Sequence, residues 1–498
     1  MSDIKTLAGQ TAIYGVPTII GRFLNYLLVP LYTYNIATQN YGVVSELYAY
    51  IAFLMIILTY GMETAFFRFT QTEKDKTIVY NTSMLSLFVS TSLFLIITFL
   101  LINPISSALE YSNNKNYIYL FLLILALDAL RAIPYALLRF EQKAARFALI
   151  KSIDIFSNIL FNLFFILLCP ILYKENNSLI TPWFNPNDLV LYIFLSNFLA
   201  SLIAVILLLP EYIRFRFRFN FKLLKKMLAY GLPVMVGGLA GMINETFDRI
   251  ALKHLVSIPK ELSLDAKTIN DYKMSQIGIY GACYKLSIII TLFIQAFKFA
   301  AEPFFFSKMK QKDAKESYSN VMTIFIIFLC IIFLGVMGYI DIFKYFIGKD
   351  YREGLKVVPI LLGANLFLGI YYNLSIWYKV TDKTIYGAYI AIFGALITLI
   401  LNYLLVPTMG YMGAALTTLV CYFAIAALCY LLGQKYYPIN YNLKHIFIYI
   451  FSTLLLYLLM TILPIESTTI KLLVNTILII IFIIIAYKLD IKQQIRKI

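Results

Sequence analysis

Long apolar runs separated by short polar turns make up this chain from end to end. Runs such as Ser83–Ile102, Val321–Tyr339 and Thr469–Tyr487 are each long enough to cross a bilayer as a helix. The pattern therefore predicts an all-α polytopic membrane protein. We predict about fourteen spanning helices, roughly at residues 8–32, 42–66, 80–102, 117–138, 147–170, 189–210, 226–252, 277–303, 320–342, 356–378, 385–406, 411–433, 443–463 and 469–488.

The second half of the chain repeats the first. Tyr14-Gly15-Val16-Pro17 returns as Tyr230-Gly231-Leu232-Pro233, and Tyr41-Gly42 returns as Tyr280-Gly281 at an offset of about 239 residues. Repeats of this kind are typical of transporters. The prediction is two parallel six-helix bundles followed by two extra helices, organised as an N-terminal lobe at 1–211, a basic linker at 212–225, a C-terminal lobe at 226–435 and helices 13 and 14 within 436–498.

Composition supports a membrane protein and charge gives its orientation. Hydrophobic residues make up 61% of the chain and charged residues only 14%, with a mean hydropathy of +0.79. The polar start, Met1–Gln10, lacks the features of a removable signal peptide. The termini and even-numbered turns hold about 25 Lys and Arg residues, against about 11 in the odd-numbered turns, so the positive-inside rule places both termini in the cytoplasm.

The predicted linker alternates basic and aromatic residues from Arg214 to Phe219 and continues with Lys222 and Lys225. Such interleaving, together with a net charge of +16, can indicate a nucleic-acid surface. In a membrane protein it more often marks an interfacial segment, with rings in the headgroup layer and cations on anionic lipid. We favour the second interpretation.

Motifs of soluble enzymes are missing from the sequence. It contains no Gly-rich loop ending in Gly-Lys-Ser/Thr, no Gly-x-Ser-x-Gly and no His-Glu-x-x-His, and its only histidines are His254 and His445. The five cysteines lie in or beside apolar segments, as small core residues do. These features argue against an enzyme, a metal site or a bound cofactor.

Ionisable residues inside the predicted spans are the candidates for function, because a charge in hydrocarbon is costly and normally faces a wet cavity. Arg22 lies near the middle of the first span without an acid three or four residues away, and its planar fork suits a phosphate or diphosphate. Other charges form pairs that can be structural or functional: we expect contacts on one helix face for Asp128/Arg131, Lys151/Asp154 and Glu245/Arg249.

Prolines occur at matching positions of the two halves. Pro17 and Pro233 each remove a backbone hydrogen bond from a predicted span, as in the bendable helices of many transporters. Because the proline recurs in both halves, we predict a gating role for these two residues.

The chain resembles the polysaccharide transporter family, the flippases for O-antigen and capsule repeat units within the multidrug/oligosaccharidyl-lipid/polysaccharide exporter superfamily. The likeness is carried by Lys5–Gly15, Gly21-Arg22, Pro30–Thr33, Tyr230–Pro233 and Asp248-Arg249. The resemblance implies transport of glycans on undecaprenyl diphosphate across the bacterial inner membrane by alternating access, with the polysaccharide polymerase and glycosyltransferases as partners besides the membrane lipids.

The resemblance also implies roles for named residues. Basic side chains of a central cavity would bind the diphosphate or acidic sugars, and those that match this role are Arg22, Arg249, Lys285 and Lys298. The chain departs from a purely cationic cavity, since it also has acids there. These leave room for a coupling proton or sodium ion, and the candidates for coupling are Glu46, Asp128, Glu245 and Asp248.

Two other functions remain open. A drug or metabolite antiporter of the same superfamily, driven by a cation, would favour a cavity dominated by acids. A membrane-embedded glycosyltransferase or polymerase would need a larger loop with catalytic groups, and no turn here exceeds about 25 residues. The sequence therefore favours a flippase and not an enzyme.

Overall fold

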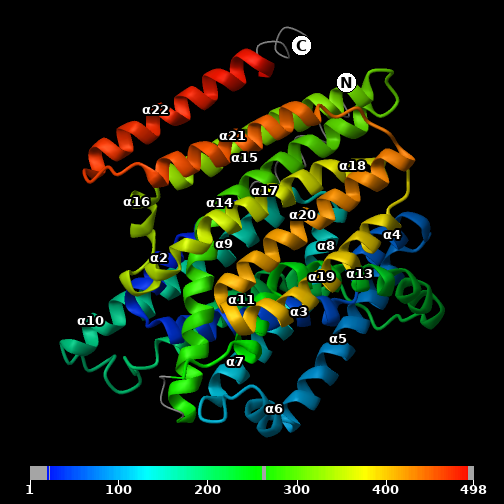
Figure 1. Ribbon diagram of the computed structural model, residues 1–498. Coiled ribbons are helices and arrows are strands. Elements are labelled where there is room, and N and C mark those ends of the chain that lie inside the picture. The colour runs from blue at the N-terminus through cyan, green and yellow to red at the C-terminus, as the bar shows by residue number, and fades with distance from the viewer. Residues whose placement is uncertain (1–19, 22, 261–264, 492–498) are drawn as a thin grey trace. The chain divides into compact units, whose positions relative to one another are not determined.

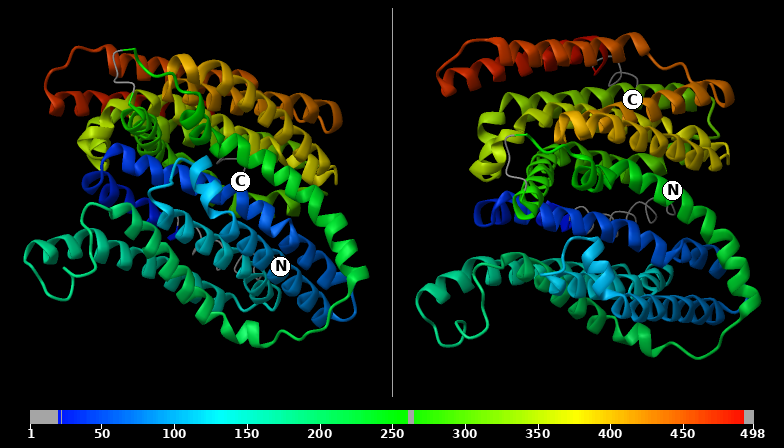
Figure 2. Two further views of the ribbon diagram at one scale, coloured as in Figure 1. Left: turned by 90° about the horizontal axis from the view of Figure 1, so that it is seen from below. Right: turned by 60° about the horizontal axis from the view of Figure 1, so that its bottom comes forward.

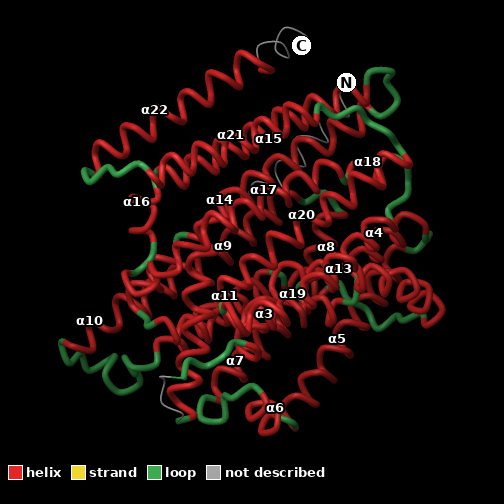
Figure 3. The backbone as a smooth tube through the Cα atoms, in the orientation of Figure 1, coloured by secondary structure: helices red, strands yellow, loops and turns green. Residues whose placement is uncertain are grey.

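Helices account for the regular structure of this protein in a computed structural model, which describes residues 20–21, 23–260 and 265–491. The described part contains no β-strand (Figure 3). It includes thirteen helical segments that are long and apolar enough to cross a membrane. The predicted all-α polytopic fold is therefore confirmed for the described residues. The first predicted span, 8–32, lies mostly outside them.

The chain divides into two compact units, residues 1–250 and 251–498 (Figure 1). The sequence repeat places 226–250 with the second half, whereas in the structure these residues belong to the first unit. The reason is local packing: Leu223 and Met227, in the first turns of α13, are buried in a core with Phe66, Leu87 and Ile133 of the first unit.

In the first unit, polar residues start several helices by accepting hydrogen bonds from free backbone N–H groups. Asp75 accepts from Thr77 and Ile78 at the start of α5, and Asp188 accepts from Leu191 at the start of α11. The helices are α2 (Leu28–Asn35), α3 (Thr38–Thr59), α4 (Met62–Thr72), α5 (Lys76–Leu100), α6 (Ile102–Ala108), α7 (Lys115–Leu130), α8 (Ala132–Phe140), α9 (Ala144–Leu163), the π-helix η1 (Phe164–Leu168), α10 (Cys169–Lys174), α11 (Leu189–Leu207), α12 (Leu209–Ile213) and α13 (Phe221–Leu255).

The second unit is built in the same way, with Asp265 and Asn442 capping α14 and α21. Its helices are α14 (Ala266–Lys308), α15 (Ala314–Gly338), α16 (Ile340–Phe343), η2 (Lys344–Phe346), η3 (Lys349–Val357), α17 (Val358–Leu374), α18 (Ile376–Val380), α19 (Ile385–Met409), α20 (Tyr411–Tyr436), α21 (Leu443–Ile462), α22 (Thr468–Ala486) and η4 (Tyr487–Ile491). Helix α20 packs on α17 and α19, and α21 and α22 form a hairpin against α15 (Figure 2).

The second predicted span is interrupted in the structure. We expected one helix at 42–66, but α3 ends at Thr59 and α4 begins at Met62. Between them Tyr60 and Gly61 adopt positive φ angles of 33° and 70°. A right-handed helix cannot pass through two such residues, so the chain turns there.

Candidate functional site

A largely buried cluster of charges lies among α7, α8 and α9 in the first unit. Arg131, between α7 and α8, contacts the carboxylate of Asp128 at 2.6 Å and that of Asp154 at 3.1 Å. The cation between two carboxylates compensates charges that would be costly to bury alone. The predicted contact between Asp128 and Arg131 is confirmed.

The predicted contact between Lys151 and Asp154 is wrong. The Lys151 ammonium lies 4.3 Å from the centroid of the Tyr135 ring, and no ion pair within the described residues joins it to Asp154. Spacing by three puts the two side chains on one helix face, but it says nothing of neighbouring helices. Arg131, from the junction of α7 and α8, donates a hydrogen bond from its guanidinium to the Asp154 carboxylate.

Polar side chains of α11 and α3 extend this cluster. The hydroxyl of Ser201 donates to Oδ1 of Asp128 at 3.0 Å, and the amide of Asn197 donates to the phenol oxygen of Tyr48 at 2.7 Å. Ser201 and Asn197 lie one helical turn apart on α11. Asp128 is therefore held by two groups, the Ser201 hydroxyl of α11 and the Arg131 guanidinium that it shares with Asp154. A change in its charge would disturb all of these contacts together.

Arg249, near the C-terminal end of α13, also has a carboxylate partner. Its guanidinium donates to Oδ1 of Asp248 at 2.7 Å and to the backbone carbonyl of Glu245 at 2.7 Å, and both Arg249 and Asp248 are largely buried. The side chain of Glu245 is exposed and forms no ion pair within the described residues. The predicted contact between the Glu245 and Arg249 side chains is therefore wrong, because the adjacent carboxylate of Asp248 reaches the guanidinium.

Glu46 is fully buried in α3. The phenol of Tyr111, in the loop between α6 and α7, donates to its Oε2 at 2.5 Å. Glu46 thus fixes a loop from within the helix bundle. This contact gives it a structural role in the first unit, and its predicted role in coupling stays a prediction.

In the second unit a small pocket with a cavity volume of about 10 Å³ lies beside α14 and includes the predicted residue Lys298. The Lys298 ammonium lies 4.2 Å from the centroid of the Tyr372 ring, and Lys379 forms an ion pair with Glu302 at 2.5 Å. The cavity has room for about one water molecule. Its lining combines two cations, one acid and an aromatic face, which are groups that contact an anion or a sugar. Lys285 lies partly buried in the same helix, about three and a half turns away.

Pro233 lies inside α13, which continues on both sides of it. Two residues earlier, Gly231 meets Gly61 of the α3–α4 turn. A Cβ atom on Gly231 would lie 2.7 Å from the carbonyl oxygen of Tyr60, and one on Gly61 would lie 2.3 Å from the carbonyl oxygen of Gly231. The two backbones therefore cross in direct contact, beside the proline that removes a hydrogen bond from α13. The predicted Pro17 and Arg22 lie outside the described residues.

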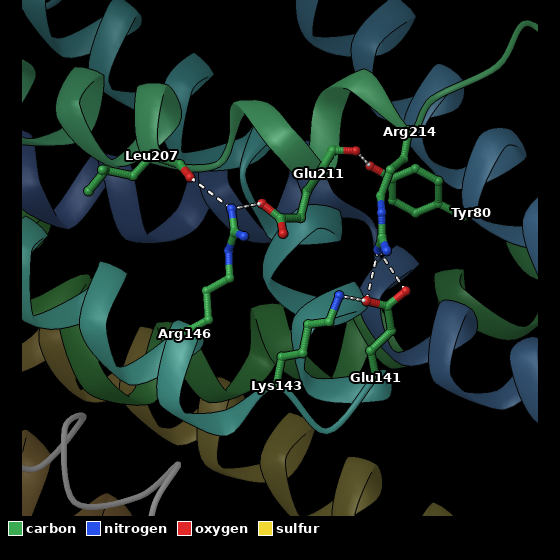
Figure 4. A network of polar contacts seen from close by, with 7 residues as sticks. All are labelled: Tyr80, Glu141, Lys143, Arg146, Leu207, Glu211 and Arg214. Atoms are coloured by element: carbon green, nitrogen blue, oxygen red, sulfur yellow. Dashed lines mark hydrogen bonds and ion pairs between the residues drawn. The ribbon is translucent and has the colours of Figure 1, made fainter.

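A second network of charges ties the start of the linker to the first unit (Figure 4). Arg214 donates to both carboxylate oxygens of Glu141 at 2.7 and 2.8 Å, and Lys143 contacts the same carboxylate at 2.7 Å. Arg146 contacts the buried Glu211 at 3.1 Å.

The network changes the ionisation of its members. Partial burial tends to raise the pKa of Glu141, but the hydrogen bonds from Arg214 and then from Lys143 outweigh it and hold that pKa below its ordinary value. The hydrogen bond with Glu141 raises the pKa of Arg214. The linker is thus attached through groups that are charged at neutral pH.

Several residues of these sites were not predicted. The roles of four residues can be recognised only from their contacts in the structure: Gly61, Tyr111, Ser201 and Lys379. For Gly61 the sequence did contain a signal, because a glycine within an expected helix can mark a break. Among the described residues no group of three or more His, Cys, Asp or Glu could hold a metal ion.

Comparisons with known proteins give both a family and a fold. The model of a family described as polysaccharide biosynthesis protein matches residues 7–309. No curated protein matches the chain.

Solved structures show the same fold at low identity. A lipid II flippase, MurJ, in an inward closed conformation has a TM-score of 0.72 at 15% identity, with 95% of this chain and 98% of that chain covered. A multidrug resistance MATE family transporter in an inward-facing conformation has a TM-score of 0.56 at 14% identity, covering 87% and 94%. The MATE transporter VcmN of Vibrio cholerae in the bent form has a TM-score of 0.55 at 11% identity, covering 90% and 100%.

Proposed function

Because the chain belongs to the polysaccharide biosynthesis protein family, we propose that it is a flippase for lipid-linked glycans. It would move oligosaccharide repeat units on undecaprenyl diphosphate from the cytoplasmic to the periplasmic leaflet of the bacterial inner membrane, with both termini in the cytoplasm. The observation that carries the proposal is this family membership together with a fold shared, over almost the whole chain, with a protein named as a flippase for lipid II.

The pocket beside α14 supports a role in binding the glycan carrier. Lys298 and Lys379 offer cations to a diphosphate or an acidic sugar, and the Tyr372 ring offers a face to a sugar. Arg22, Arg249 and Lys285 are the further basic residues that we assign to the substrate. A bound anion would compete with Glu302 for Lys379, so binding would weaken that ion pair.

The buried cluster around Arg131 supports coupling to an ion. Asp128 can take up a proton or sodium ion only if its contacts with Arg131 and Ser201 rearrange, which would couple ion binding to movement of α7 and α11. Glu46, Glu245 and Asp248 are further candidates for this coupling, and Pro17 and Pro233 for the gating movement.

The proposal is tested in a strain that lacks the protein. Lipid-linked glycans are extracted and sized, and surface polysaccharide is stained. A flippase predicts that single repeat units accumulate on the lipid carrier, that surface glycan is lost, and that wild type restores it. Lys298→Gln and Arg22→Ala should fail to restore it, whereas Lys312→Gln, at an exposed lysine outside the pocket, should succeed.

A cation-coupled antiporter is the second candidate, favoured by the similarity to MATE transporters and by the buried carboxylates. It predicts unchanged glycan pools and accumulation of cationic dyes in the deletion strain. That result would overturn the flippase proposal.

A further inference from the structure

The segment that joins α12 to α13 presents aromatic rings to the outside. Phe217 is 88% exposed and Phe221 is 70% exposed, which places both among the most exposed large apolar side chains in the described part of the chain. We call the exposed set Arg216, Phe217, Arg218, Phe219, Phe221 and Lys222 the linker face. Its rings and cations alternate, so both kinds of group lie on the same short stretch.

The backbone beneath the linker face is held by the first unit. The amide of Arg216 donates to Oδ1 of the buried Asn81 at 2.9 Å, and the amide of Asn220 donates to the hydroxyl of the buried Thr82 at 3.3 Å. Arg214 is fixed on Glu141 just before it, and Leu223 is buried just after it. The exposed rings therefore stand on an anchored backbone and not on a loose loop.

All charges of this segment are positive. Between Tyr212 and Asn244 the sequence has six basic residues and no acid: Arg214, Arg216, Arg218, Lys222, Lys225 and Lys226. Apart from Arg214, none of these side chains forms an ion pair within the part of the chain that the structure describes. Five cations beside exposed rings thus have no carboxylate partner among the described residues, whereas other basic residues of this unit, such as Arg214, form ion pairs.

We propose that the linker face binds the anionic headgroups of phospholipids. Phe221 is the first residue of α13, a membrane-spanning segment, so the linker face lies at the end of a span, where a bilayer has its headgroups. Aromatic rings prefer that layer and arginine and lysine pair with lipid phosphates there. A nucleic acid would use the same groups, but it would leave rings next to a membrane span without lipid contact.

Lipid binding here would act on the connection between the repeats. The linker is attached to the first unit and continues directly into α13, the helix that contains Pro233 and meets Gly61. A lipid that holds the linker face at the headgroup layer would fix the start of α13 while its later turns move. The inference concerns the linker alone and holds whatever substrate the protein transports.

A fluorophore at residue 217 tests the proposal. All five native cysteines are buried, so Phe217→Cys can be labelled selectively with nitrobenzoxadiazole, which brightens in an apolar setting. The full-length protein is reconstituted in phosphatidylcholine vesicles with or without about one third phosphatidylglycerol. We expect at least about twofold higher emission with phosphatidylglycerol, and loss of the difference at high salt.

Matched variants separate the linker from overall charge. Arg216→Gln with Arg218→Gln should abolish the response, whereas Lys310→Gln with Lys312→Gln removes the same charge elsewhere and should leave it intact. The same measurement from Phe219→Cys controls for loss of the Phe217 ring.

Two results would overturn the proposal. One is emission that does not depend on phosphatidylglycerol, or that responds equally in the Arg216/Arg218 variant. The other is brightening by a single-stranded RNA in vesicles without phosphatidylglycerol, combined with no response to the lipid, which would assign the face to nucleic acid.

Discussion

Replacing Gly231 by alanine tests the backbone contact between α13 and the α3–α4 turn. The added Cβ would lie 2.7 Å from the carbonyl oxygen of Tyr60, closer than any ordinary contact of a Cβ atom. Because the obstacle is backbone and not a flexible side chain, one of the two segments must shift by a few tenths of an ångström. Overpacking of this kind costs about 1–3 kcal/mol, whereas alanine in a helix gains up to about 1 kcal/mol over glycine.

Gly241→Ala is the matched control, since Gly241 lies in the same helix and a Cβ there would meet nothing within 4 Å. Both variants gain the same helix propensity, so their difference isolates the contact. We expect the purified Gly231→Ala protein to melt several degrees below Gly241→Ala in detergent and to restore less surface glycan in the deletion strain. Equal melting temperatures would refute the reasoning, because they would mean that the crossing is loose enough to accept a methyl group.

Three further outcomes follow from the charged networks. Arg131→Met leaves two half-buried carboxylates without their cation and should cost up to about 3–5 kcal/mol, seen as a large fall in melting temperature. Lys151→Met removes only a ring contact and should cost far less. Equal losses would contradict the assignment of Arg131. Glu141→Gln should speed amide hydrogen exchange at residues 214–220 by about twofold to fivefold, as expected for a partly exposed ion pair, and unchanged exchange would mean that the pair does not hold the linker. Folding lowers the pKa of Glu141, so its contacts persist above the ordinary value of 4.5 and are lost as the pH falls through the lower folded value. Amide exchange of the wild type, corrected for intrinsic rates, should therefore be constant from about pH 5 to about pH 8 and become faster at lower pH. Faster exchange near neutral pH would show that another group controls the linker.

The spanning helices could be predicted because bilayer thickness fixes their length and composition. Thirteen candidates were found among the described residues, and most lie within a few residues of the predicted bounds. The break at Tyr60 and Gly61 was missed, because hydropathy does not register a change in backbone conformation. Gly61 is apolar enough to continue an apolar run.

The charged contacts were predictable only when both partners lie on one helix. Asp128 and Arg131 contact each other as their spacing requires. Asp154 instead accepts a hydrogen bond from Arg131, 23 residues earlier in the chain, and the Lys151 ammonium lies over the Tyr135 ring. Spacing defines which side chains share a helix face. The packing of helices decides which residues of other helices contact that face, and a local sequence pattern does not predict this packing.

Movement of a lipid-linked glycan between leaflets can be measured directly in a reconstituted system. Repeat units on undecaprenyl diphosphate, extracted from the deletion strain and labelled on the sugar with nitrobenzoxadiazole, are incorporated into vesicles with the purified protein. Dithionite added outside bleaches only the outer leaflet. We predict that wild type makes the inner-leaflet label accessible too, and that Lys298→Gln slows this. If the inner-leaflet label stays protected while the same vesicles exchange a cationic dye for protons, the account is contradicted and the protein is an antiporter.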